Sequence, residues 1–326
     1  MPRYAQFSTL NTETPHDWPT LHAAAALTFA LAVSSGASLG VSLPVLGQLV
    51  VFAVLTAVVG IPHGGLDHRF GRVVCRPWAG KWWPGAFFLS YLSVGLSVLA
   101  GWTLMPLTTI AAFFLLAAIH FGEEESLPMS AVEGGMVIWI PFLARPREAT
   151  SLLSLVCPGE MSGSLQNALS DVRPLLWVLA LVLTGRVSYL AWVGLRDRER
   201  GALLKACRLA AFTVLFATAP VLIGFVAYFC GWHSTRELGG LANRVDPSRP
   251  SQGLMRVIRM SAPLSILLIV ATVLAACWRF ANGHSLEAVV LQAGFLTLSA
   301  VAVPHILLHK IAARLRVDPF FEGAQL

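Results

Sequence analysis

Apolar runs long enough to cross a lipid bilayer follow one another along most of this chain. They fall near residues 20–36, 43–62, 84–102, 104–121, 173–195, 206–232, 260–281 and 287–308. A transmembrane helix needs about 20 apolar residues, and lipid offers the backbone no hydrogen-bond partners. The runs therefore predict an all-α fold, a polytopic membrane bundle with about eight transmembrane helices.

Composition and charge fit a membrane protein better than a soluble one. Hydrophobic residues make up 56% of the 326 residues and charged residues only 12%, whereas about a quarter of a soluble domain is charged. The Lys and Arg residues behind the net charge of +6 lie in short loops and form no basic cluster interleaved with aromatic residues, so we expect no nucleic-acid partner. We predict a polar segment over 1–19, a single transmembrane domain over 20–310 and a cytoplasmic tail over 311–326.

Two segments differ from simple transmembrane runs. The segment 131–144 is short and carries Glu133, which favours a re-entrant or interfacial helix. Pro220 predicts a kink within 206–232.

The loop 63–82 is rich in Arg, and positive charge is enriched in cytoplasmic loops. We therefore expect this loop to be cytoplasmic.

Four histidines stand at or near the C-terminal ends of apolar runs, and each is followed four positions later by another ionisable residue. The pairs are His63/Asp67, His120/Glu124, His233/Glu237 and His305/His309. Residues i and i+4 lie on one face of a helix. Ionisable groups at membrane depth are expensive and mark functional sites, so the pairs predict a histidine-rich metal site gathered from several helices. We expect only peripheral positions for His16, His22, His68 and His284.

The donor set narrows the choice of metal without fixing it. Neutral imidazole binds Fe, Zn, Cu and Ni, and the chain has neither a CxxC pair nor an HExxH motif. Iron with open positions for O2 suits a lipid-soluble substrate that enters an apolar bundle. Structural roles stay open for single residues: an ion pair with a nearby arginine for Glu237, and an interfacial position for His309.

Four motifs give the chain a family resemblance. PHGGLDH (62–68), HFGEE (120–124), WHSTRE (232–237) and PHILLH (304–309) resemble, in the same order, motifs of the Brp/Blh family of bacterial and archaeal membrane proteins. The resemblance implies an enzyme of the bacterial inner membrane, an iron-dependent β-carotene 15,15′-dioxygenase. Such an enzyme cleaves the central double bond of β-carotene with O2 and gives two all-trans retinal molecules, which a microbial rhodopsin takes up.

The same resemblance implies which residues bind Fe2+. The iron-binding histidines of the family match His63, His120 and His233, and a fourth histidine of the family is replaced here by Glu237. We expect Glu237 and His305 to be further ligands. Three residues are expected to orient the ligand imidazoles or to act as alternative ligands: Asp67, Glu124 and His309. Aromatic side chains beside the metal are expected to line a substrate tunnel: Phe121, Phe229 and Trp232.

Two other functions stay open at this point. A membrane di-iron carotenoid or lipid hydroxylase or desaturase would bind two irons, although the HxxHH boxes of those enzymes are absent. A retinal-binding or rhodopsin-assembly factor would bind pigment or labile metal without turnover. One iron per chain favours cleavage, and two favour hydroxylation or desaturation.

Overall fold

The structure, a computed structural model, describes residues 18–40, 43–122, 126–157 and 162–320. Every regular element within these residues is a helix, which confirms the prediction of an all-α fold. Contacts between the helices group the chain into two compact units, which we call the first and the second unit and describe separately.

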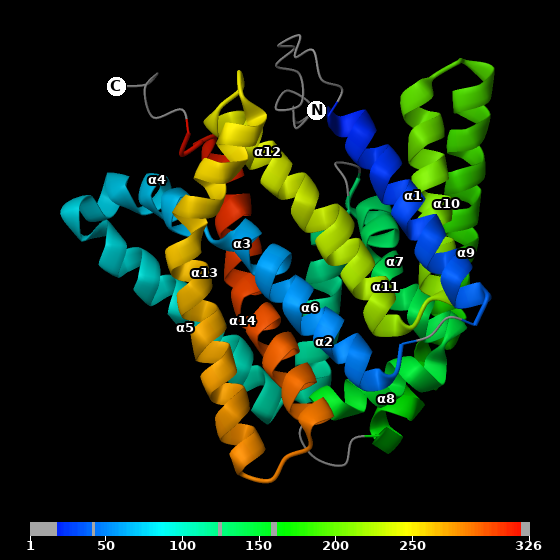
Figure 1. The fold of residues 1–326 in the computed structure, drawn as a ribbon, viewed down its shortest axis with the longest axis horizontal. Helices are drawn as coiled ribbons and strands as arrows, with labels where there is room; N and C mark the ends of the chain where they lie inside the picture. The colour runs from blue at the N-terminus through cyan, green and yellow to red at the C-terminus, as the bar shows by residue number, and fades with distance from the viewer. Residues whose placement is uncertain (1–17, 41–42, 123–125, 158–161, 321–326) are drawn as a thin grey trace. The chain divides into compact units, whose positions relative to one another are not determined.

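The first unit is centred on α10 (Arg200–Thr218). This helix packs against α9 (Ser162–Arg196), α1 (Trp18–Ser38) and α7 (Leu127–Ala144), and Figure 1 shows α9 and α10 running side by side. The unit also contains α11 (Val221–Tyr228) and parts of α6 (Pro106–Phe121) and α8 (Pro146–Val156). The helix α10 also contacts α11, so four helices pack against it.

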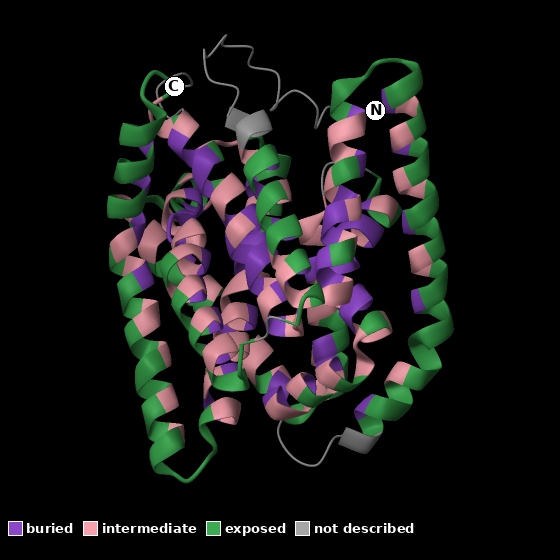
Figure 2. Cartoon of the chain, turned by 45° about the vertical axis from the view of Figure 1, so that its right-hand side comes forward, coloured by how far each residue is buried: buried purple, intermediate pink, exposed green. Residues whose placement is uncertain are grey.

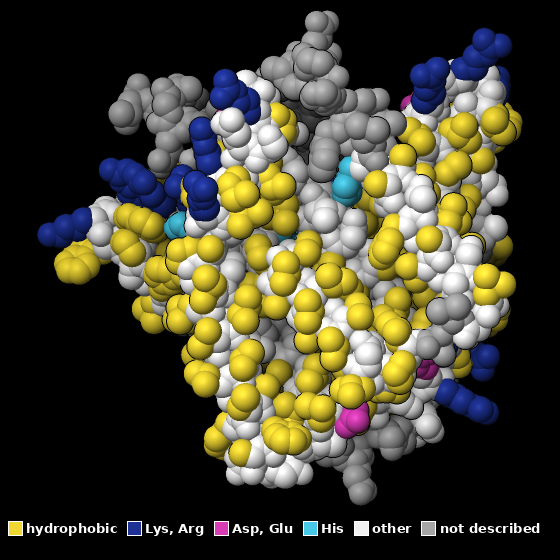
Figure 3. Space-filling view, viewed as in Figure 1, with side chains coloured by type: hydrophobic (Ala, Val, Ile, Leu, Met, Phe, Trp, Pro, Cys, Tyr) yellow, Lys and Arg dark blue, Asp and Glu magenta, His cyan; other side chains and the backbone are white. Residues whose placement is uncertain are grey.

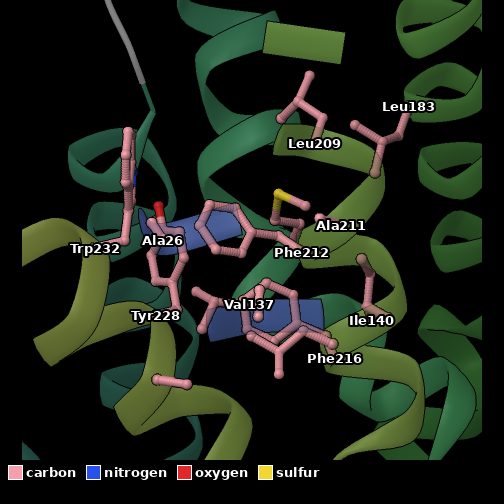
Figure 4. Close-up of a cluster of buried hydrophobic side chains, with 14 of the residues drawn as sticks. Ala26, Val137, Ile140, Leu183, Leu209, Ala211, Phe212, Phe216, Tyr228 and Trp232 are labelled. Carbon is pink, nitrogen blue, oxygen red and sulfur yellow. The ribbon is translucent and has the colours of Figure 1, made fainter. Parts of the chain in front are cut away.

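Aromatic side chains fill the core of the first unit. The rings of Phe212 and Phe216 on α10 lie 5.1 and 5.6 Å from the ring of Tyr228 on α11. Figure 4 shows these three rings beside Val137 of α7. The Tyr228 hydroxyl donates to the backbone carbonyl of Phe121 at 3.3 Å. A buried tyrosine needs such a partner, and this one joins the apolar core to the end of α6.

Glu133 is buried in the segment for which the sequence favoured a re-entrant helix. That segment is part of α7, a helix of 18 residues that is long and apolar enough to cross a membrane. The Glu133 carboxylate lies 3.1 Å from the Arg186 guanidinium and 3.0 Å from the Lys205 ammonium. A buried carboxylate is tolerated only when it is paired and hydrogen-bonded. The two cations therefore explain how an otherwise apolar helix accommodates a charge.

The second unit is centred on α14 (Leu286–Leu315). This helix packs against α5 (Trp83–Leu104), α13 (Pro250–Ala281), α4 (Asp67–Ala79) and α2 (Val45–Leu55), and α13 and α14 lie side by side in Figure 1. The unit also contains η2 (Thr56–Gly60), α3 (Ile61–Gly64), η3 (Gly80–Trp82) and α12 (Thr235–Val245). The short helix α3 contacts α12, α13 and α14, so three helices surround it.

Six helical stretches among the described residues are long and apolar enough to cross a membrane. They are Val45–Leu104, Leu127–Ala144, Ser164–Arg196, Arg200–Thr218, Pro250–Ala281 and Leu286–Leu315, and two predicted spans form the shorter apolar helices His22–Ser38 and Pro106–Phe121. Exposed residues follow the outer sides of helices in Figure 2, and on α13 they include Leu267, Leu274 and Trp278. Figure 3 shows hydrophobic side chains over much of the visible face, with Lys and Arg mainly towards its margins. The chain is thus a multi-pass membrane protein.

The run 206–232 is not the single kinked helix that the sequence predicted. One helix, α10, ends at Thr218, and the next, α11, begins at Val221. Pro220 has no backbone N–H and disfavours the helical conformation of the residue before it. Ala219 is accordingly extended. Helical hydrogen bonding therefore stops at this point instead of bending through it.

A buried polar contact between α5 and α14 gives a first prediction. The indole N–H of Trp102 donates to the Ser299 hydroxyl at 2.9 Å, and both side chains are buried. Replacing Ser299 with alanine leaves that N–H without its acceptor, so the free energy of unfolding should fall by about 1–3 kcal/mol. Thermal unfolding of the purified protein would measure the loss. The matched control is Ser90→Ala, whose exposed hydroxyl donates only to its own helix; equal loss in both variants would contradict the prediction.

Candidate metal centre

Two π-helices lie at predicted ligand histidines. One, η2 (Thr56–Gly60), leads directly into α3, which carries His63, and the other, η4 (Phe229–Ser234), contains His233. A π-helical turn is rare and occurs frequently at functional sites. The backbone is therefore irregular at two of the positions where the sequence predicted a metal ligand.

His63 lies edge-on against His305. Their ring centroids are 5.5 Å apart and their planes are inclined by 83°. The Nδ1 atom of His63 hydrogen-bonds to the backbone carbonyl of Gly60. A carbonyl only accepts, so Nδ1 carries the proton and the lone pair of the neutral ring lies on Nε2. Gly64 lies beside the same ring, since a Cβ there would be in ordinary van der Waals contact with His305 Nδ1 at 3.7 Å.

The i, i+4 spacing predicted that Asp67 and His63 share one face of a helix, and this prediction is wrong. The two residues lie on different helices, because α3 ends at Gly64 and α4 begins at Asp67. The Asp67 carboxylate instead accepts hydrogen bonds from two imidazoles of α14. His305 Nδ1 lies 2.8 and 3.0 Å from its two oxygens, and His309 Nε2 lies 3.2 Å from Oδ1.

A third donor to the same carboxylate comes from α5. The Tyr91 hydroxyl lies 2.7 Å from Asp67 Oδ2. Tyr91 lies outside the four sequence motifs, although a tyrosine within an apolar run needs a partner for its hydroxyl. The potential ligand atoms of Asp67, His305 and His309 all lie within 4.8 Å of one another, so this group could hold a metal ion.

His120 and His233 meet in the first unit. Their ring centroids are 5.0 Å apart, and His233 is only 2% exposed. Two of the predicted tunnel residues cover the His233 ring: the Phe121 ring lies 4.8 Å away edge-on, and the Phe229 ring stacks on it at 6.0 Å. An aromatic environment of this kind excludes water from the imidazole.

The third predicted tunnel residue, Trp232, faces a different set of side chains. Its ring stacks on His22 at 4.8 Å and lies 4.6 Å from the guanidinium carbon of Arg208. His22, expected to be peripheral, therefore contacts a tunnel candidate. A pocket of the first unit is lined by Phe121, Glu133, Met136, Arg208, Leu209, Phe212, Tyr228 and Trp232.

Glu237 is partly exposed and lies beside an arginine. Its side chain is 46% exposed and lies 3.5 Å from Arg236, which is the ion pair that the sequence left open. Glu237 belongs to α12 and not to the π-helix of His233, so the two do not share one regular α-helical face. It does interact electrostatically with three histidines of the second unit: His63, His305 and His309. The predicted Glu124 lies outside the described residues.

Fold and site together define a polytopic helical membrane protein with closely packed histidines in each of its two units. The chain belongs to the β-carotene 15,15′-dioxygenase family, because the model of that family matches residues 54–312. The match confirms the resemblance drawn from the four motifs.

One curated relative and the solved structures complete the comparison. The chain is similar to the probable β-carotene 15,15′-dioxygenase Blh of Halobacterium salinarum, with 25% identity over 225 residues. The similar region covers 61% of this chain and 63% of the relative, so the chain spans less than two thirds of the relative's length. No solved structure matches.

Proposed function

We propose that this protein cleaves the central double bond of β-carotene with O2 and forms two all-trans retinal molecules. Family membership supports a carotenoid as the substrate. The observation that carries the proposal is the packing of imidazoles in pairs, His63 against His305 and His120 against His233, at the histidines of the four motifs. We further propose Fe2+ as the metal, the bacterial inner membrane as the location and a microbial rhodopsin as the recipient of the retinal.

The donor chemistry of these residues fits iron. Imidazole nitrogen is a ligand for Fe2+, and a ligating histidine normally donates its other ring N–H to a carbonyl or a carboxylate. His63 does so to Gly60, and His305 does so to Asp67. When bound, Fe2+ would supply coordination positions for O2. As iron ligands we propose His63, His120, His233 and His305, with Glu237 as a carboxylate ligand.

The remaining task of the chain is to position the polyene and to exclude water. β-Carotene is lipid-soluble, so we propose that it enters from the bilayer between helices and contacts Phe121, Phe229 and Trp232. Fixing the reacting double bond lowers the entropic part of the barrier, and a dry site protects the reaction from side products. Both atoms of O2 end in the two aldehydes, so the net reaction requires no proton from a side chain, and we assign no general acid or base.

Retinal formation in cells tests the proposal directly. The full chain is expressed in bacteria that accumulate β-carotene, and the extracted pigments are chromatographed. We expect retinal from the wild type and at least about 100-fold less from His120→Ala. Loss of a residue that only hydrogen-bonds to a metal ligand typically lowers activity by about 10–100-fold, and loss of a ligand itself should lower it at least as much. The matched control is His284→Ala, which changes an exposed histidine and should leave retinal formation unchanged.

Other products would replace the proposed function with one of its competitors. Hydroxylated or desaturated carotenoids, together with two irons per chain, would identify a di-iron enzyme. Intact β-carotene with retinal bound but not formed would identify a binding or assembly factor. Full activity of a folded His120→Ala variant would remove this histidine from the metal site.

A further inference from the structure

We propose that Tyr91 is a positioning residue for the metal ligand His305, because its phenol fixes the carboxylate that orients this imidazole. The inference rests on the proposed iron site and adds a residue that the motifs do not contain. It follows from the hydrogen bonds of Asp67, from the packing of α5 against α14 and from the ring atoms that His305 and His309 use.

Asp67 is the acceptor for three side chains. Asp67 is only 5% exposed, so water does not readily replace a hydrogen-bond donor that is lost. Oδ1 accepts from His305 and from His309 at 2.8 and 3.2 Å. Oδ2 accepts from the Tyr91 hydroxyl at 2.7 Å and lies 3.0 Å from His305 Nδ1. Tyr91 therefore provides the shortest hydrogen bond to the carboxylate and the only one of the three that comes from outside α14.

The backbone brings Tyr91 to this position through a close helix contact. One turn after Tyr91, Gly95 lies so close to α14 that a Cβ there would be 2.9 Å from the carbonyl oxygen of Ala300. Pro304, four residues after Ala300, has no N–H to donate to that carbonyl. The Tyr91 hydroxyl also lies 3.2 Å from the carbonyl oxygen of Val301. The phenol is thus held against the turn of α14 that precedes His305.

The two histidines of α14 present different nitrogens to Asp67. A carboxylate accepts, so His305 donates from Nδ1 and keeps its lone pair on Nε2. His309 donates from Nε2 and keeps its lone pair on Nδ1. Only His305 therefore has the tautomer that we infer for His63, and His309 serves as a second support for the carboxylate. Without the Tyr91 hydroxyl, only the two histidines of α14 hold the carboxylate, and the orientation of the His305 ring becomes less fixed.

Tyr91→Phe tests the inference, because it keeps the ring and removes only the hydroxyl. The matched control is Tyr189→Phe, since Tyr189 is 55% exposed and its ring packs on Trp192. Three properties of each full-length variant are measured. They are the amount of iron that each chain retains in the presence of a chelator, the visible spectrum of the Co2+-loaded protein, and the thermal unfolding of the metal-free protein. We expect Tyr91→Phe to retain iron about 10–100-fold more weakly and to change the cobalt spectrum. Metal-free Tyr189→Phe should unfold like the wild type, and metal-free Tyr91→Phe should unfold at a slightly lower temperature, because a buried carboxylate loses one donor.

The outcomes separate this inference from the proposed function. Wild-type iron retention and an unchanged cobalt spectrum in Tyr91→Phe would overturn the positioning role while leaving the dioxygenase intact. Iron loss with an unchanged cobalt spectrum would also overturn it, since the hydroxyl would then support only the fold. If the wild type itself retains no iron and forms no retinal, the proposed function fails, and the positioning role fails with it.

Discussion

Replacing His305 with asparagine should release the iron, whereas replacing His309 with glutamine should leave most of it bound. An asparagine amide lies near the position of Nδ1, so it still donates to Asp67 but has no counterpart of Nε2. A glutamine amide lies near the position of Nε2, which is the atom that His309 uses toward Asp67. We expect iron retention to fall by more than about 100-fold in His305→Asn. In His309→Gln it should fall by less than the about 10–100-fold that is typical when a residue hydrogen-bonded to a ligand is lost.

Iron per chain after chelator treatment measures both effects, with retinal formation as a second readout. His309→Leu is the matched control for the glutamine variant, because it removes the donor and should weaken iron binding further. Equal loss of iron in His305→Asn and His309→Gln would point to a different arrangement, in which Asp67, His305 and His309 bind the metal together.

Replacing Gly134 with alanine should destabilise the first unit strongly. A Cβ on this residue of α7 would lie 2.2 Å from both the carbonyl oxygen of Ala118 and the backbone nitrogen of Gly122. Backbone atoms cannot rotate away as a side chain can, so α7 and the end of α6 would have to separate. Overpacking in a core typically costs about 1–3 kcal/mol, and more when the backbone must move. We expect a loss of at least about 3 kcal/mol.

The yield of folded protein and its unfolding temperature measure this loss. Gly185→Ala is the matched control: Gly185 lies within α9, and a Cβ there would meet nothing within 4 Å. Alanine favours a helix over glycine by about 1 kcal/mol, so the control should be as stable as the wild type or more stable. A Gly134→Ala protein that unfolds at the temperature of Gly185→Ala would show that the two helices can move apart at little cost.

Hydropathy predicted the helices well because lipid leaves the backbone few alternatives. It was less informative where helices end. Pro220 was expected to bend one helix and instead separates two, because Ala219 adopts an extended conformation. A single buried charge such as Glu133 argued against a full helix, since its partners Arg186 and Lys205 are remote in sequence.

The histidines of the candidate site and Asp67 could be chosen from the sequence, but which of these residues contact one another could not. The i, i+4 argument assumes an unbroken α-helix, and this condition fails between His63 and Asp67. The position of Tyr91 depends on the packing of α5 against α14, which no local spacing encodes. Sequence patterns therefore identified candidate ligands, while the hydrogen bonds that orient them required the tertiary structure.

The hydrogen bond between Asp67 and His305 also constrains the order of events during synthesis. The two residues are separated by 238 positions, so a long stretch of chain has to be synthesised after Asp67 before His305 exists. Until α14 has been inserted, this carboxylate lacks both of its imidazole donors. Insertion of α14 therefore completes the hydrogen bonds of Asp67, and the proposed metal site at His305 can form only on a chain that includes this helix.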